Sequence, residues 1–173
     1  MTTSTALKPD DLERLISGTH WNPRAILGPH PTTQGLAIRT WIPFAESVEI
    51  LSAGQAAPIP TRRIHDAGLF EAILPKQSHA LHYKIRARAA DGTITESHDP
   101  YALPPLLTDF ELHLFSEGTF YRAYESLGAH VRTVEEITGV HFVVWAPNAA
   151  RVSVVGEFNR WDGRCHPMTN RGA

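Results

Sequence analysis

One stretch of this sequence occurs twice, and that repeat restricts the possible folds more than any other feature. A glycine, a tryptophan and a proline stand at the same spacing in both stretches, namely Gly35, Trp41 and Pro43, and 104 residues later Gly139, Trp145 and Pro147. A unit that recurs at a fixed spacing is one structural module used twice. The first copy runs on to Asp99, whereas only 28 residues (146–173) follow Trp145. We therefore expect one complete module followed by the first half of a second.

Short strand-like runs separated by turn residues make up the first module. Four runs are rich in apolar residues, at 36–42, 47–52, 69–74 and 81–89. Asp91-Gly92, which follows the fourth run, is typical of a tight hairpin turn, and the chain returns through Ile94. Several short strands at this spacing predict an all-β fold, an immunoglobulin-like β-sandwich.

A short helix is expected before the first module. Pro9 suits the first helical turn and Gly18 suits the end of the helix. Between the modules, residues 110–127 are rich in aromatic residues and leucine, and we interpret them as a connecting segment with a short helical turn. The predicted organisation is an N-terminal helical segment, a first β-sandwich module, a junction and a truncated second β-sandwich module, at residues 1–19, 20–108, 109–130 and 131–173.

The charge balance and the apolar pattern exclude several classes of partner. The chain has 16 basic and 18 acidic side chains, and its densest basic cluster is only Arg62-Arg63. Neither nucleic acid nor an anionic membrane surface is therefore expected as a partner. No apolar run approaches the roughly 20 residues that a membrane helix needs. The first residues lack the apolar core of a signal peptide and Cys165 is the only cysteine, which together favour the cytoplasm.

The second copy contains the most specific motifs of the chain. They are Trp145-Ala-Pro and, shortly after it, Phe158-Asn-Arg-Trp161-Asp162. This stretch resembles the family-48 carbohydrate-binding module, which precedes the catalytic barrel in bacterial glycogen (1,4-α-glucan) branching enzymes. The segment 114–130 is also similar to the junction between the two N-terminal modules of those enzymes. The resemblance extends over nearly the whole chain and implies an N-terminal region that is truncated before the catalytic barrel.

The resemblance implies a parent enzyme whose chemistry lies outside this sequence. Branching enzymes cut an α-1,4-glucan and re-attach the segment through an α-1,6 bond, with a carboxylate pair held in a (β/α)₈ barrel. We therefore expect no catalytic residue and no cofactor in this chain. The implied partners are an α-glucan such as glycogen and the barrel of the same polypeptide, in an enzyme that is monomeric at full length. Two alternatives stay open, a stand-alone glycogen- or starch-binding module and the N-terminal part of a related debranching enzyme.

Trp161 and Asn159 are the candidate carbohydrate-binding residues. Trp161 stands in a polar loop after a predicted strand, and an indole can cover the apolar face of a sugar ring while the sugar hydroxyl groups stay in water. Asn159 can supply directional hydrogen bonds. Related glycogen-binding modules use the matching tryptophan in this way. The alternative is that Trp161 packs against the catalytic barrel or against its own sheet.

The other aromatic and metal-ligating residue types are expected to be structural. Trp41 and Trp145 recur within the repeated strand, so we expect both to pack in or against a core. The first copy has no counterpart of the Phe-Asn-x-Trp motif, which argues against glucan binding by that module. His79 and His82 form the closest histidine pair, but no carboxylate or cysteine stands at ligand spacing, and no metal site is expected.

Overall fold

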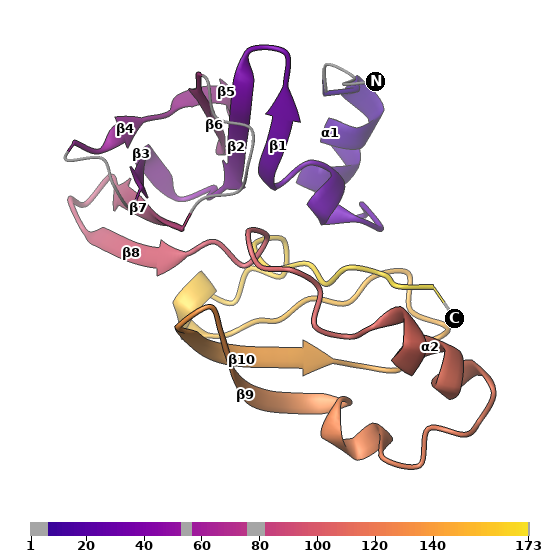
Figure 1. Ribbon diagram of the computed structural model, residues 1–173. Helices are drawn as coiled ribbons and strands as arrows, with labels where there is room; N and C mark the ends of the chain where they lie inside the picture. The colour runs from indigo at the N-terminus through magenta and orange to yellow at the C-terminus, as the bar shows by residue number, and fades with distance from the viewer. Residues whose placement is uncertain (1–6, 53–56, 76–81, 173) are drawn as a thin grey trace.

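The computed structural model of the chain describes residues 7–52, 57–75 and 82–172. Its N-terminal part consists of two four-stranded antiparallel sheets, and a two-stranded hairpin lies next to them (Figure 1). One sheet has the order β1 (Gly28–Thr32), β2 (Gly35–Trp41), β6 (Leu69–Leu74) and β5 (Arg62–His65). The other has the order β4 (Ile59–Pro60), β3 (Ala45–Ser52), β7 (Tyr83–Ala89) and β8 (Ile94–His98). The predicted all-β sandwich is confirmed.

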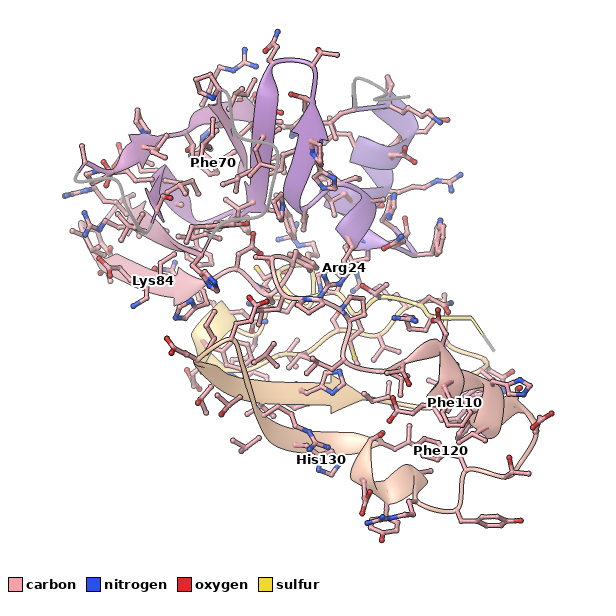
Figure 2. All side chains as sticks on the ribbon, viewed as in Figure 1. Arg24, Phe70, Lys84, Phe110, Phe120 and His130 are labelled. Atoms are coloured by element: carbon pink, nitrogen blue, oxygen red, sulfur yellow. The ribbon has the colours of Figure 1, made fainter. Side chains whose placement is uncertain are left out.

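The core of the first module lies between these two sheets. Alternation along β7 buries Tyr83 and Ile85 and leaves Lys84 exposed, as the sequence predicts. Ile38 of β2 and Phe70 of β6 pack against them from the other sheet, and Figure 2 shows Phe70 inside the sandwich. Each large apolar side chain buried in this way stabilises the fold by about 1.5–3 kcal/mol.

Helix α1 (Pro9–Ser17) and the 3₁₀ turn η1 (Pro23–Ala25) lie beside the first sheet (Figure 1). Gly18 ends the helix in the left-handed conformation, with φ of 71°, which a glycine adopts without steric cost. Leu15 is buried in a second apolar cluster together with Leu27 and Trp41. The helix therefore packs on the sandwich through its apolar face.

The order of elements in the first module recurs after residue 108. Helix α2 (Asp109–Ser116), the turn η2 (Ala123–Glu125), β9 (Gly128–Val134) and β10 (Ile137–Val143) correspond to α1, η1, β1 and β2. His30 Nε2 donates to the Leu27 carbonyl at 3.1 Å, and His130 Nε2 donates to the Leu127 carbonyl at 2.8 Å. The segment that the sequence suggested as a connector is thus a second copy of the helix and turn.

The second repeat departs from the first after β10. Through the offset of 104 residues, the repeat predicts a strand at 151–155 as the counterpart of the run at 47–52, but the structure has only an isolated bridge there, between Ser153 and Pro167. Val154 N–H donates to the His166 carbonyl at 3.0 Å beside this bridge. Among the described residues, β10 pairs with β9 alone. In the first module the corresponding strand β3 pairs with β4 and β7, and among the described residues the segment after β10 has no such partner strands, so its backbone stays irregular.

Three strands of the first module, β1, β4 and β5, were not predicted, and each lies at the edge of its sheet. Two sequence-based expectations fall outside the described residues: His79 of the histidine pair, and Leu81 at the start of the fourth predicted strand.

Arg24 holds the chain where it leaves the first module. Its Nη1 donates to the carbonyl oxygens of Tyr101 at 3.1 Å and Leu103 at 2.7 Å, and its Nη2 donates to that of Pro100 at 3.1 Å. Figure 2 shows Arg24 between the two repeats. Because the guanidinium presents its donors in a rigid fork, these bonds fix the path of the linker.

Candidate functional site

The predicted carbohydrate-binding residues lie in one loop of the second repeat, residues 156–164, called here the Trp161 loop. The 3₁₀ turn η3 (Glu157–Asn159) forms its first part. Trp161 is 65% exposed, and its indole Nε1 donates to Glu157 Oε1 at 3.2 Å. Trp161 therefore does not pack into its own sheet, and its ring is accessible to a ligand or to another domain.

Asn159 lies beneath the loop and not on its surface. The residue is 1% exposed. Its Nδ2 donates to the Val154 carbonyl at 2.8 Å and lies 3.0 Å from His166 Nδ1, while its Oδ1 accepts from Gly156 N–H at 2.9 Å. The hydrogen bond to a sugar that the sequence suggested is replaced by bonds inside the protein, and Asn159 positions the loop.

Two consecutive residues of the Trp161 loop have a left-handed backbone. Their φ angles are 55° at Arg160 and 59° at Trp161, in a region that costs a non-glycine residue about 1–2 kcal/mol. Trp161 N–H donates to the Gly156 carbonyl at 3.0 Å, which helps to hold this conformation. Backbone strain that the surrounding structure enforces is common at binding sites, so it favours a functional role for the loop.

Phe158 adds a second exposed aromatic ring, which the sequence identified only as part of the motif. Its ring meets His166 edge to face, with centroids 5.4 Å apart and planes at 74°. Burial lowers the pKa of His166, so this imidazole is neutral near pH 7. Burial also raises the pKa of Cys165 to about 11, so its thiol stays protonated and is a poor nucleophile.

The two repeated tryptophans differ in burial. Trp41 is 4% exposed, and its Nε1 donates to the Ala67 carbonyl at 2.9 Å. Trp145 is 51% exposed and packs on Phe115 of α2, with ring centroids 4.9 Å apart. Leu15 of α1 stands in the same cluster as Trp41, so each tryptophan packs against the helix of its own repeat and has a structural role.

An open groove of about 880 Å³ is lined by α2, the β9–β10 hairpin and the C-terminal segment. Its lining includes Val140 and Phe142, which stand 104 residues after the core residues Leu36 and Ile38. Phe142 is 41% exposed whereas Ile38 is fully buried, at 0%. The groove thus displays the core face of the second repeat, and the Trp161 loop is the better candidate for a sugar.

The Trp161 loop can act as an aromatic platform with polar groups at its edge. Stacking on one aromatic side chain contributes about 1–3 kcal/mol in the comparable case of nucleic-acid bases.

No group of three or more potential metal ligands occurs at 7–52, 57–75 or 82–172. Within the same described ranges, no helix is long and apolar enough to cross a membrane.

Two known families match successive parts of the chain. Residues 8–101 match the family described as "alpha-1,4-glucan branching enzyme GlgB, N-terminal domain". Residues 126–173 match "Carbohydrate-binding module 48 (Isoamylase N-terminal domain)". The Trp161 loop falls within the second match.

Individual relatives show the same similarity. The chain is 48% identical over 170 residues to the 1,4-alpha-glucan branching enzyme GlgB of Rhodopseudomonas palustris (strain BisA53), covering 97% of the chain and 23% of the relative. It is 47% identical over 165 residues to the enzyme of the same name from Paramagnetospirillum magneticum, covering 95% and 22%. The chain thus spans less than a quarter of the length of these curated relatives. A solved pullulanase from Paenibacillus barengoltzii is similar at 21% identity and a TM-score of 0.36, over 43% of this chain and 12% of that one.

Proposed function

Because this chain belongs to the alpha-1,4-glucan branching enzyme GlgB N-terminal domain family, we propose that it is the non-catalytic N-terminal part of a 1,4-α-glucan branching enzyme. The resemblance that the Trp145-Ala-Pro and Phe-Asn-x-Trp motifs indicated is confirmed by both family matches and by the relatives. The parent enzyme transfers α-1,4-glucan segments into α-1,6 branches in glycogen biosynthesis. We place it in the cytoplasm, in keeping with the single cysteine.

The proposal gives the two modules different roles. The second repeat binds α-glucan through Trp161. The first module lacks the Phe-Asn-x-Trp motif and supports the second repeat and the catalytic barrel. A bound α-glucan is held near the barrel of the same polypeptide, which raises its effective concentration there.

The observation that supports this proposal best is the exposed indole of Trp161 above the buried amide of Asn159. The three internal contacts of Asn159 hold the loop before any ligand arrives. A binding surface that is already ordered loses less entropy when it binds. An exposed, preorganised aromatic ring is what stacking on a sugar requires.

Replacing Trp161 by alanine is expected to weaken glycogen binding by about 1–3 kcal/mol, the scale of stacking on one aromatic ring. Electrophoresis in gels with and without glycogen measures the retardation of wild type and Trp161→Ala. Trp21→Ala is a matched control, because Trp21 is also exposed and lies outside the loop. Equal retardation of wild type and Trp161→Ala would remove Trp161 from the site, and an unretarded wild type would contradict glucan binding by this chain.

A further inference from the structure

We propose that the first module holds the Trp161 loop in its binding conformation, through two arginines of the loop that stack on Trp41 and Phe44. The proposal rests on the proposed function of Trp161 as a glucan-binding residue. It gives the first module a part in glucan recognition that needs no sugar contact of its own.

Two cation–π contacts join the loop to the first module. The guanidinium carbon of Arg160 lies 4.4 Å from the centroid of the Phe44 ring, and that of Arg164 lies 5.5 Å from the Trp41 ring. Both distances are within the roughly 6 Å at which this attraction acts. Trp41 ends β2 and Phe44 immediately precedes β3, so one turn of the sandwich receives both arginines.

The two arginines stand on either side of Trp161 in the sequence. Arg160 precedes it directly and shares its left-handed backbone. Arg164 follows and pairs with Asp162, with Nε donating to Oδ1 at 2.9 Å and Nη2 to Oδ2 at 2.7 Å. This paired geometry fixes the plane of the guanidinium. The backbone that carries the indole is therefore attached to the first module at both ends.

Two further contacts join the first module to residues on either side of the Trp161 loop. Arg151 Nη1 donates to the Gly18 carbonyl at the end of α1, at 3.0 Å, where a cation is favoured by the helix dipole. Tyr101 OH donates to the Pro167 carbonyl at 3.3 Å. In Figure 1 the short yellow helical turn, η3, lies on the side of the second repeat that faces β8. The contacts of Arg160 and Arg164 are thus part of a continuous seam between the modules.

The sequence repeat indicates that Phe44 is specialised for this contact. Position 44 corresponds to Asn148 in the second copy, 104 residues later. The aromatic ring that receives Arg160 is therefore not a requirement of the repeated turn itself. Its partner Arg160 keeps a left-handed backbone that is unfavourable in isolation. If the contact is lost, a smaller fraction of molecules presents Trp161 correctly, and the apparent affinity falls by that fraction.

The test separates the aromatic ring from simple packing. Phe44→Leu keeps apolar bulk but removes the ring, and it should weaken glycogen binding about 2- to 5-fold, as expected for one exposed cation–π contact. Phe44→Trp keeps the ring and should bind like wild type. Arg160→Asn removes the guanidinium while suiting the left-handed backbone, and it should weaken binding by the same factor. The double variant Phe44→Leu/Arg160→Asn should be no weaker than either single variant, because both substitutions break one contact.

Electrophoresis of the full 173-residue chain through glycogen gels provides these affinities, with Trp21→Leu as a control that should not change them. Amide exchange in 156–164 should become faster in Phe44→Leu and in Arg160→Asn. Equal weakening by Phe44→Leu and Phe44→Trp, or unchanged binding in both Phe44→Leu and Arg160→Asn, would overturn the proposal. If Phe44→Leu unfolds in a thermal melt, Arg160→Asn decides, because Arg160 is exposed. If Trp161→Ala loses glycogen binding while Arg160→Asn binds like wild type, only this proposal is overturned and the proposed function remains intact.

Discussion

Asp99 is buried where the chain leaves the first sandwich and turns toward the second repeat. Its Oδ2 accepts from Tyr83 OH at 2.5 Å, and its Oδ1 accepts from Tyr101 N–H at 2.8 Å. Burial raises the pKa of Asp99 above its ordinary value of 3.8, although these hydrogen bonds oppose the shift. The folded chain therefore holds a proton on this carboxyl group more tightly than the unfolded chain does.

The raised pKa predicts that Asp99 loses stabilising effect as the pH rises. Its contribution is fully present below the ordinary pKa and disappears as the pH passes the folded-state pKa, because the unfolded chain gives up this proton first. Urea unfolding between about pH 3 and pH 7, for wild type and Asp99→Asn, isolates this effect from that of the other carboxylates. The free energy of unfolding of wild type minus that of the variant should decrease with rising pH. A constant or increasing difference would show that the pKa is not raised.

The two candidate site residues show what a sequence can and cannot tell about single side chains. Trp161 could be placed on the surface because its neighbours in the motif are polar. Asn159 could not be placed, because asparagine in a turn either faces water or bonds to nearby backbone. Its partners include Val154 and His166, which come to the same point only when the chain folds back at the Ser153–Pro167 bridge.

The turn between β9 and β10 has an unfavourable sequence for its backbone. Glu135 and Glu136 fill the two positions between the paired residues Val134 and Ile137, and their φ angles are 50° and 68°. A two-residue turn with both φ angles positive is favoured by Asn-Gly. Two glutamates instead place both side chains in the left-handed region and two like charges side by side.

Replacing Glu135 by asparagine and Glu136 by glycine should raise the free energy of unfolding by about 1–2 kcal/mol, because the left-handed strain is relieved. Urea unfolding measures the change. The same dipeptide at Thr33 and Gln34 is the control, since that turn joins β1 to β2 and neither residue has a positive φ. The strain at Glu135 and Glu136 would be contradicted if the free energy of unfolding rose equally at both turns. It would also be contradicted if the substitution in the β9–β10 turn gave no increase.

The central strands could be predicted from sequence, but of the edge strands only β8 could, through the Asp91-Gly92 turn before it. The apolar runs predicted β2, β3, β6 and β7, because both neighbours in the sheet and the opposite sheet require apolar residues there. β1 contains Pro29 and Pro31, which argue against a strand in general but are tolerated at a sheet edge. The strand expected at 151–155 has a suitable sequence, but strand formation depends on a partner more than on propensity.

At the scale of the whole molecule, equivalent positions of the two repeats differ in how deeply they are buried. Leu36 and Ile38 are closed in by two sheets, whereas their counterparts Val140 and Phe142 line an open groove. A two-stranded hairpin with one apolar face in water is only marginally stable. We therefore expect the free energy of local opening to be high in the first module and low in the second repeat.

Amide hydrogen exchange on the dilute monomer measures this difference. Residues 36–41, 69–74 and 83–88 should exchange slowly, near the rate set by global unfolding, and residues 139–172 should exchange fast. The segment 156–164 should be the slowest part of the second repeat, because of its contacts with Phe44 and Trp41. Slow exchange throughout 139–172, equal to that of the first module, would show that the second repeat is stable by itself.

NMR spectra of the ¹⁵N-labelled chain, recorded while maltoheptaose is added, test most directly whether the Trp161 loop is the glucan-binding surface. Maltoheptaose is a linear α-1,4-glucan. The largest chemical-shift change is expected at the indole N–H of Trp161, followed by the backbone amides of 156–164. Smaller changes should reach Phe44 through Arg160, and the turn at Thr33 and Gln34, at the opposite end of β2 from Trp41, should not respond. Changes confined to the first module or to the groove around Phe142, or no change at millimolar sugar, would contradict the assignment.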